Sequence, residues 1–352
     1  MNTSPKYALL VPTSMGVRLT PSNGQPAHSA TSFELQVTSA ETNVASVLSY
    51  LGMPVKVLTA LVQGHPFAAR IRSDLRGRGM DVEAVELEQG GPWGLRHQIN
   101  IADTGAGPRG PRVWNDRSGE AGRELKAGDF NLERIFCWEG VRMMHLSGLV
   151  AAIAPGFCLD LAEKAHKYGC PVSFDLNYRA SFWKGQEKQL RDVFTRIASL
   201  AEVLIGNEED FQLCLGIEGP EVGGNGLAGK TEAFKSMLGR IRERFPGARV
   251  VATTLREVLD AGTHLWGAVV ADAAGAVVIE PREIHVLDRI GGGDGFVGGL
   301  LYGILKGWSL EECADFGWAS GALAVTLPTD YAIPADEQQI WSIWKGNARV
   351  LR

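Results

Sequence analysis

Residues 288–296 are Asp-Arg-Ile-Gly-Gly-Gly-Asp-Gly-Phe and pass directly into a helical pattern. Asp294 opens that helix and follows three consecutive glycines, Gly291, Gly292 and Gly293. Glycine permits φ > 0 and a close approach of the backbone to a ligand. The free N–H groups and the dipole at a helix start attract anions, and a carboxylate placed there is suited to take a proton from a hydroxyl. The stretch predicts a phosphoryl-transfer turn with Asp294 as the base.

Strands and helices are predicted to alternate around this turn. Short apolar runs predict strands near 7–12, 143–146, 172–175, 203–205 and 249–253, with two more β segments near 265–271 and 276–279. The spacing of apolar residues predicts helices near 40–51, 155–168, 187–200, 208–215, 231–245, 294–306, 310–325 and 336–344. This alternation indicates an α/β fold with a mostly parallel sheet and helices on both faces.

Residues 94–116 follow a different pattern. Apolar residues alternate only weakly there, and the chain then turns through the glycine- and proline-rich run 105–111. Such a segment predicts exposed antiparallel strands and loops. We interpret it as a candidate lid.

Composition narrows the class of protein. The chain has 352 residues, of which 45% are hydrophobic, and a net charge of −5. That balance favours neither nucleic acid nor an anionic membrane as a partner. The five cysteines are widely spaced and form no Cys-x-x-Cys pair, so we expect reduced thiols in a cytoplasmic protein. No apolar run approaches the ~20 residues of a membrane span.

Polar residues also follow two of the predicted strands. The first cluster, 173–179, is Ser-Phe-Asp-Leu-Asn-Tyr-Arg, and the second, 205–210, is Ile-Gly-Asn-Glu-Glu-Asp. Ligands bind at the carboxyl ends of strands in open parallel sheets, so these clusters and the glycine turn are expected to meet. Arg179 offers a guanidinium fork for phosphate or carboxylate. Glu209 or its neighbours offer carboxylates for Mg²⁺, directly or through water.

Each cluster also has a simpler interpretation. Asp175 and Asn177 are suitable caps for the following helix. The acids at 208–210 are favoured by the dipole at a helix start, with no ligand involved. Three polar clusters at three strand ends nevertheless make a shared site the stronger hypothesis.

The segment 224–231, Gly-Asn-Gly-Leu-Ala-Gly-Lys-Thr, matches the P-loop pattern letter for letter. A working P-loop requires a buried strand that leads directly into it. The preceding run 216–223 is rich in glycine and has the composition of a loop. Lys230 and Thr231 are therefore interpreted as the start of a helix.

Several segments together resemble the ribokinase-like, or phosphofructokinase-B type, sugar kinases. The glycine turn matches their C-terminal signature, and two segments look more specifically like 2-keto-3-deoxygluconate kinases: SFDLNYRASFW (173–183) and GNEEDFQLCLG (206–216). Further similar segments are SFELQV (32–37), SAETNVASVLSYLG (39–52), PRVWNDRSGEAG (111–122) and VVATTLRE (250–257).

The resemblance implies a three-layer αβα ribokinase-like fold. One kinase domain would span residues 1–352, with a small β-stranded lid formed by segments near 13–40 and 94–116. The implied reaction transfers the γ-phosphate of ATP, with Mg²⁺, to a hydroxyl of a sugar or sugar acid. Lids of such kinases often pair between subunits, which implies a homodimer.

The resemblance also assigns roles to individual residues. Asp294 would be the catalytic base, and the amides of Gly291, Gly292 and Gly293 would form the anion hole. The implied sugar contacts are Ser39, Glu41, Asn43, Arg117, Arg179 and Asp330. The expected nucleotide contacts are Asn177, Arg179, Asn207, Thr254, Arg256, Gly291 and Gly293, and the expected Mg²⁺ ligand is Glu209.

Some positions depart from the family pattern. Thr38 and Ser39 stand where members usually carry two glycines, which adds two hydroxyls beside the sugar. Thr13-Ser14 replaces an early Gly-Glu, and Trp318 aligns with an asparagine near the adenine. The nucleotide loop, often Gly-x-x-Gly, is Thr-Leu-Arg-Glu-Val at 254–258. These changes leave the identity of the sugar open.

The leading hypothesis is an ATP- and Mg²⁺-dependent kinase for 2-keto-3-deoxygluconate or a related keto sugar acid. One alternative is a kinase for another sugar, such as a ribose-, fructose- or nucleoside-like acceptor. A second is a non-catalytic sugar or nucleotide sensor, and a third is a P-loop nucleotidase.

Overall fold

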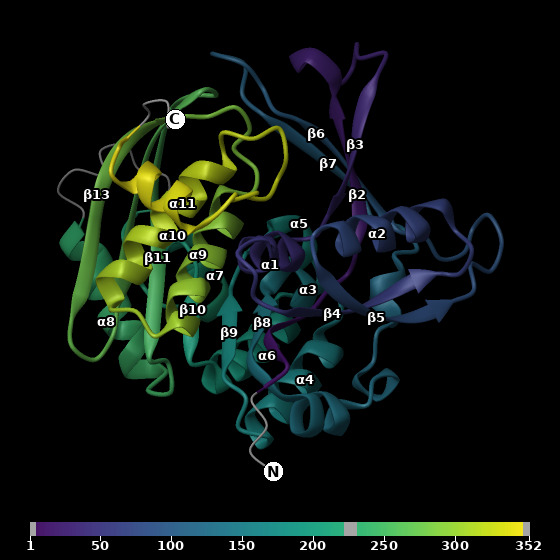
Figure 1. Cartoon of the computed structure of the whole chain (residues 1–352), viewed down its shortest axis with the longest axis horizontal. Helices are drawn as coiled ribbons and strands as arrows, with labels where there is room; N and C mark the ends of the chain where they lie inside the picture. The colour runs from purple at the N-terminus through teal and green to yellow at the C-terminus, as the bar shows by residue number, and fades with distance from the viewer. Residues whose placement is uncertain (1–4, 222–230, 348–352) are drawn as a thin grey trace.

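A large sheet with helices on both faces forms the body of the computed structural model, which describes residues 5–221 and 231–347 (Figure 1). Its strand order in these residues is β13-β12-β11-β10-β9-β8-β1-β4-β5, and every pairing is parallel except β11 with β12 and β12 with β13. The strands are β1 (Tyr7–Pro12), β4 (Val55–Val62), β5 (Met80–Leu87), β8 (Val141–Ser147), β9 (Val172–Asp175), β10 (Val203–Ile205), β11 (Val250–Asp260), β12 (Thr263–Ala271) and β13 (Ala276–His285).

Two helical layers bury the two faces of this sheet. One contains α1 (Ala40–Tyr50), α2 (Pro66–Gly77), α9 (Gly292–Lys306), α10 (Leu310–Ala324) and α11 (Glu337–Trp344). The other contains α3 (Gly148–Ile153), α4 (Pro155–Lys167), α5 (Ala180–Trp183), α6 (Glu187–Leu200), α7 (Glu208–Leu215) and α8 (Thr231–Arg244).

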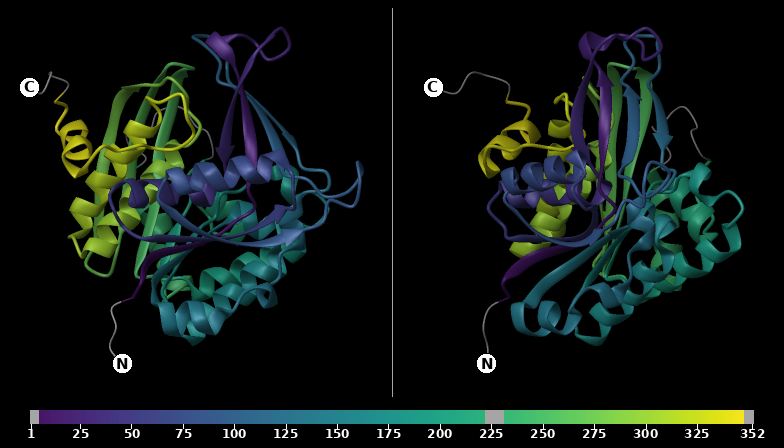
Figure 2. Two further views of the ribbon diagram at one scale, coloured as in Figure 1. Left: turned by 45° about the vertical axis from the view of Figure 1, so that its right-hand side comes forward. Right: turned by 90° about the vertical axis from the view of Figure 1, so that its right-hand side faces the viewer.

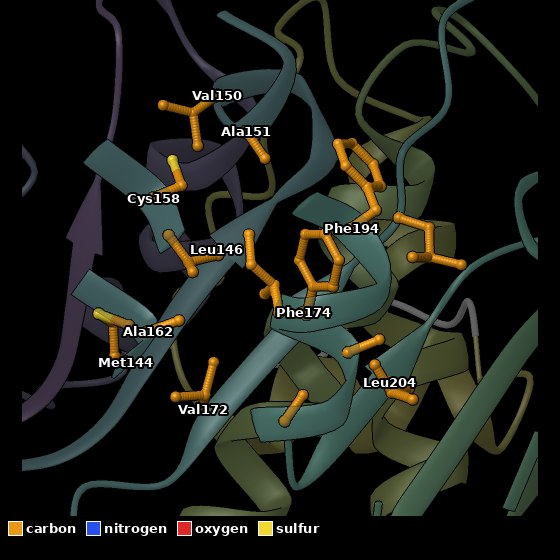
Figure 3. Close-up of a cluster of buried hydrophobic side chains, with 14 of the residues drawn as sticks. Met144, Leu146, Val150, Ala151, Cys158, Ala162, Val172, Phe174, Phe194 and Leu204 are labelled. Carbon is orange, nitrogen blue, oxygen red and sulfur yellow. The ribbon is translucent and has the colours of Figure 1, made fainter. Parts of the chain in front are cut away.

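Each face of the sheet has its own apolar core. Successive strand residues point to opposite faces, so Val203 and Ile205 join one core while Leu204 joins the other. Figure 3 shows part of the core that contains Leu204. There the rings of Phe174 from β9 and Phe194 from α6 meet edge to face, with their centroids 5.3 Å apart. Burial of this apolar surface holds the strand ends in fixed positions.

A second, smaller sheet projects from the large one (Figure 2). Its strand order is β3-β2-β6-β7, formed by β2 (Gly16–Pro21), β3 (Phe33–Thr38), β6 (Gln98–Asp103) and β7 (Arg112–Asp116). β6 and β7 pair antiparallel, as expected for 94–116, whereas β2 pairs with β6 in parallel. We call this sheet the lid. β3 leads through Ser39 into α1, so one end of the lid is joined directly to the body.

The predicted αβα fold with a mostly parallel sheet and a small β lid is confirmed. The predicted strand at 249–253 is longer, because β11 continues to Asp260 as one arm of a hairpin with β12. The unit β4, α2 and β5 had no assignment from the sequence. The P-loop-like segment 224–231, apart from Thr231 at the start of α8, falls outside the described residues.

Candidate active site

The glycine turn begins α9 in the conformation that an anion site requires. Gly291 has φ +88°, and a Cβ atom there would lie 1.9 Å from the carbonyl oxygen of Asp330. Only glycine fits this position without displacing the backbone. No side chain among the described residues caps the start of α9, so its first N–H groups remain available to a ligand.

Asp294 lies in the first turn of α9 with its carboxylate held by α1. Asn43 Nδ2 donates to Asp294 Oδ2 at 2.9 Å. Burial raises the pKa of Asp294 well above its ordinary value; the hydrogen bond from Asn43 opposes this rise, and the charges of Asp175 and Asp330 add to it. A carboxyl group with a raised pKa is a stronger base when ionised, which suits proton removal from a hydroxyl.

Asp330 lies beside the turn and is only 2% exposed. The hydroxyl of Thr38, at the end of β3, donates to Asp330 Oδ2. Asp330 Oδ1 is buried and has no partner in the part of the chain that the structure describes. Thr38, which replaces the first of the two expected glycines, thus binds one oxygen of Asp330 and leaves the other as a free acceptor.

The two other polar strand ends meet next to the turn. Asp175, at the end of β9, has its pKa raised to about 7, first by burial and then by the charge of Asp210. Asn177 has φ +38°, and its Oδ1 atom is buried and finds no partner in the described ranges. Asp175 and Asp294 are close enough for the charge of Asp175 to raise the pKa of Asp294. The structure thus joins these strand ends into one site.

Capping explains part of the second cluster. Asn207 is the N-cap of α7: its Oδ1 accepts from Asp210 N, and Asp210 Oδ2 accepts from Asn207 N, both at 2.8 Å. Asp210 Oδ1 also accepts from Tyr178 N at 2.9 Å, which ties the loop after β9 to α7. Burial raises the pKa of Asp210 to about 6. The side-chain oxygen of Asn207 is therefore occupied by the cap.

Arg179, Arg256 and Arg289 bring positive charge to the predicted nucleotide side. The side chain of Arg256 is exposed, yet partial desolvation by the surrounding protein and then the charges of Arg289 and Arg179 lower its pKa to about 10. Burial and then the charge of Arg179 lower the pKa of Arg289. Within residues 5–221 and 231–347, none of the three forms an ion pair. Three unpaired guanidinium groups are suited to a polyphosphate. Sequence reasoning missed Arg289, although it stands only two positions before Gly291.

Several predicted sugar contacts are held within the protein. Glu41 is 1% exposed, and its carboxylate accepts hydrogen bonds from Thr13 and Ser147, which oppose the rise in its pKa on burial. Ser39 caps α1 through a bond from Thr42 N, at 3.2 Å. These side chains fix the geometry of the α1 start that carries Asn43.

Arg117 lies at the base of the lid. Its Nη1 donates to Glu120 Oε1 at 2.7 Å, and its Nε is buried and has no partner among the residues that the structure describes. Ser14 donates to the same Glu120 oxygen at 2.6 Å. Thr13 and Ser14 stand where the family pattern has Gly-Glu. Their hydroxyls donate to the buried carboxylates of Glu41 and Glu120.

The remaining predicted nucleotide and metal residues lie at the edges of the site. Thr254 is half-buried on β11, and Glu209 is exposed in the first turn of α7. Trp318 is buried, and its Nε1 donates to the carbonyl of Trp266 at 2.7 Å. The described residues contain no group of three potential metal ligands from His, Cys, Asp and Glu. Glu209 therefore stays a prediction.

Arg18 is a further residue that the sequence interpretation missed. It lies on β2 of the lid, is 2% exposed and forms a buried ion pair with Asp288, the first residue of the glycine-turn stretch. Burial raises the pKa of Asp288, and the charge of Arg18 opposes the rise. The sequence signal that could have revealed it is a single arginine in the middle of a segment in which apolar and polar residues alternate.

The sequence model of the pfkB family carbohydrate kinases matches residues 17–336. The chain belongs to this family. It is a carbohydrate kinase, a phosphotransferase with an alcohol group as acceptor. It is 25% identical over 326 residues to a 2-dehydro-3-deoxygalactonokinase from Haloferax volcanii, with 92% of each chain covered. It is also 25% identical over 308 residues to a 2-dehydro-3-deoxygluconokinase from Bacillus subtilis, covering 86% of this chain and 85% of the relative.

Solved structures of the family have the same fold. A 2-dehydro-3-deoxygluconokinase from Thermotoga maritima matches with a TM-score of 0.87 and 28% identity, over 97% of this chain and 100% of that one. A putative ribokinase II from E. coli matches with a TM-score of 0.77 at 16% identity, over 97% of this chain and 99% of that one, which shows the fold alone. No helix among the described residues is both long and apolar enough to cross a membrane.

Proposed function

We propose that this carbohydrate kinase transfers the γ-phosphate of ATP to a hydroxyl of 2-keto-3-deoxygluconate or a related keto sugar acid. The observation that carries the proposal is Asp294, held by Asn43 beside an uncapped, glycine-lined helix start. A base and an anion site in direct contact are what transfer of phosphate to a hydroxyl requires. The names of the relatives from H. volcanii, B. subtilis and T. maritima support a keto sugar acid as the acceptor.

In the proposed mechanism Asp294 removes the proton from the acceptor hydroxyl. The resulting oxygen attacks the γ-phosphorus in line, and ADP leaves. The amides of the glycine turn hold the developing charge on the transferred phosphoryl group. Arg179, Arg256 and Arg289 bind the polyphosphate.

Mg²⁺ would neutralise part of the phosphate charge when it is bound with the nucleotide. Glu209 is the proposed ligand, directly or through water. Its exposed carboxylate fits that role, because Mg²⁺ usually keeps several waters and takes only one or two protein carboxylates.

The lid is proposed to exclude water from the reaction. Thr38 binds Asp330 and Arg18 binds Asp288, so both lid contacts end at residues that flank the glycine turn. An open site would pass phosphate to water, so lid contact and transfer are expected to be coupled.

The opposite face of the lid is proposed to pair with a second copy of the chain. Leu19, Leu35, Ile99 and Ile101 are partly exposed there, and Trp114 is 47% exposed. Apolar side chains on this outer face suit an interface between subunits. The four buried free cysteines and the exposed Cys137 fit a reducing compartment, so we place the enzyme in the cytoplasm.

A sugar panel tests the proposal. Purified protein with ATP and Mg²⁺ is assayed for ADP release with 2-keto-3-deoxygluconate, 2-keto-3-deoxygalactonate, ribose, fructose and a nucleoside. We expect the keto sugar acids to give the highest kcat/KM. A preference for ribose, fructose or the nucleoside would contradict the proposed acceptor. A sugar-induced rise in Tm without ADP release from any compound would favour a sensor instead.

A further inference from the structure

The inner face of the lid carries a row of polar side chains across three neighbouring strands. In the strand register Arg18 of β2 stands opposite Gln36 of β3 and, on its other side, opposite Asn100 of β6. Opposed residues in a sheet project from the same face. The ion pair between Arg18 and Asp288 shows that this face looks toward the glycine turn. We call these three residues the inner-lid row.

Atoms of all three side chains are buried and have no partner within residues 5–221 and 231–347. They are Arg18 Nε and Nη1, Gln36 Oε1 and Asn100 Oδ1. Buried polar groups are nearly always hydrogen-bonded, and one left unpaired destabilises the folded state. What sets these atoms apart is that they lie on one face of three adjacent strands, where a single polar ligand would satisfy them together.

Existing contacts fix how these side chains are oriented. Arg18 uses Nη2 to bind Asp288, which leaves Nε and Nη1 free. Gln36 donates its Nε2 to the carbonyl of Pro328, which leaves Oε1 as its free acceptor. The row therefore presents guanidinium donors in the middle and an amide acceptor on each side.

The chemistry of the row specifies the group that would satisfy it. The central donors require an acceptor, either a carboxylate or a keto oxygen. The flanking amide oxygens require donors, which sugar hydroxyls supply. A keto sugar acid carries both kinds of group on neighbouring carbons. Ordered water is the competing occupant, because water also donates and accepts.

We propose that Arg18, Gln36 and Asn100 are specificity-determining residues that bind the keto or carboxylate end of the acceptor and its adjacent hydroxyls. The inference rests on the proposed function and deepens it. It assigns a polar sugar-recognition element to the lid, separate from the residues that act on the phosphate. Thr38 lies on the same face and holds Asp330, so the row ends next to the catalytic turn.

Asn100→Ala is the first test, with Asn115→Ala as its matched control. Asn115 is paired with Asn100 across the strands, has the same side chain, and is exposed. Loss of one hydrogen bond to a hydroxyl predicts a rise of about 3- to 10-fold in the KM for 2-keto-3-deoxygluconate, with kcat and the KM for ATP unchanged. The control variant keeps the wild-type KM. An unchanged KM for Asn100→Ala, as expected if the row holds only water, overturns the proposal.

Asn100→Asp is the second test, because it separates recognition from a structural role. The new carboxylate would lie beside the free guanidinium donors of Arg18 and occupy them. We expect the KM for 2-keto-3-deoxygluconate to rise by ~100-fold or more through competition for Arg18 and repulsion of the acid. For ribose or fructose, which lack the acid, the change is expected to be smaller. An equal loss for charged and neutral sugars contradicts the proposal.

The sugar panel keeps this inference separate from the proposed function. The variants are assayed with whichever sugar gives the wild-type protein its highest kcat/KM. A different preferred sugar would therefore contradict the proposed acceptor and still leave the row testable. A measured Tm for each variant confirms that it is folded before kinetics are compared.

Discussion

The glycine turn and the lid face each other but differ in how their polar groups are satisfied. In the turn, Asp294 has a fixed partner in Asn43, and Gly291 packs against the backbone of Asp330. On the inner lid, Arg18 keeps two buried nitrogens without partners among the described residues. The protein thus fixes the carboxylate of the proposed base and leaves the first N–H groups of α9 for a ligand, whereas the lid leaves part of its central guanidinium group unpaired. We therefore expect the turn to carry out the reaction and the lid to select the acceptor.

The largest expected effect tests the turn. Asp294→Asn keeps the size of the side chain and a partner for Asn43 but removes the base. We expect kcat to fall by ~10²- to 10⁴-fold, as for other losses of a general base. Steady-state kinetics with saturating sugar and ATP measure this effect. Near-normal turnover would remove Asp294 from its proposed role.

A smaller loss of kcat is expected when the glycine turn is shifted in position than when the catalytic base is removed. In Gly291→Ala the new methyl group meets the carbonyl of Asp330, and the residue has φ +88°. A shift of about 1 Å in the anion site predicts a fall in kcat of ~10²-fold. Gly307→Ala is the control, because Gly307 has φ +76° at the other end of α9 with open space around it. That variant loses stability but keeps kcat, and an equal fall in its kcat would contradict the argument from geometry.

The lid side predicts a milder change. Thr38→Val removes the hydroxyl that binds Asp330 while keeping the shape of the side chain. We expect the KM for the sugar to rise by up to ~10-fold, the usual scale for one hydrogen bond, with little change in the KM for ATP. Thr38→Ser retains the hydroxyl and should behave like wild type. If Thr38→Val affects the KM for ATP as strongly as that for sugar, Thr38 acts on the whole fold and not on the acceptor.

The smallest effect is one of stability and depends on pH. The folded protein holds a proton on Asp294 above its ordinary pKa of 3.8, whereas the unfolded chain releases it. The free energy of unfolding therefore falls as pH rises from about 4 toward the raised pKa. The Asp294→Asn variant has no carboxyl group to titrate at this position, so its free energy of unfolding does not fall in this way. Its Tm should therefore exceed that of wild type by an amount that grows with pH. Thermal denaturation across this range measures the difference, and a gap that shrinks with rising pH would reverse the sign of the argument.

The sequence was informative where chemistry and local structure coincide. Strand ends such as 173–179 have buried runs before them and polar residues after them, and the structure joins them at one edge of the sheet. The turn at Gly291 could be predicted because glycine is the residue that tolerates the positive φ that this turn requires. The fold class and the gathering of Asp175 and Asp294 could therefore be predicted.

The rest depended on contacts between distant segments. Arg18 and Asp288 are separated by 270 positions, and Thr38 and Asp330 by 292. No local sequence pattern therefore predicts either pair. Glu41 resembled a sugar contact in the sequence, but the structure directs it to the hydroxyls of Thr13 and Ser147. Side-chain direction is set by tertiary packing, which spacing along the chain does not encode.

The glycines of α9 restrict how this enzyme can change over evolutionary time. A Cβ atom at Gly298 would lie 2.6 Å from the carbonyl of Val44 in α1, and one at Gly299 would lie 2.8 Å from the carbonyl of Phe316 in α10. Helices packed this closely accept few substitutions, so the helix that carries Asp294 has little room to drift. In the lid, a Cβ atom at Gly16 of β2 would instead meet the flexible side chain of Gln98, not the backbone. Directed evolution toward new acceptors should therefore accumulate its productive mutations in β2, β3 and β6 and leave α9 unchanged.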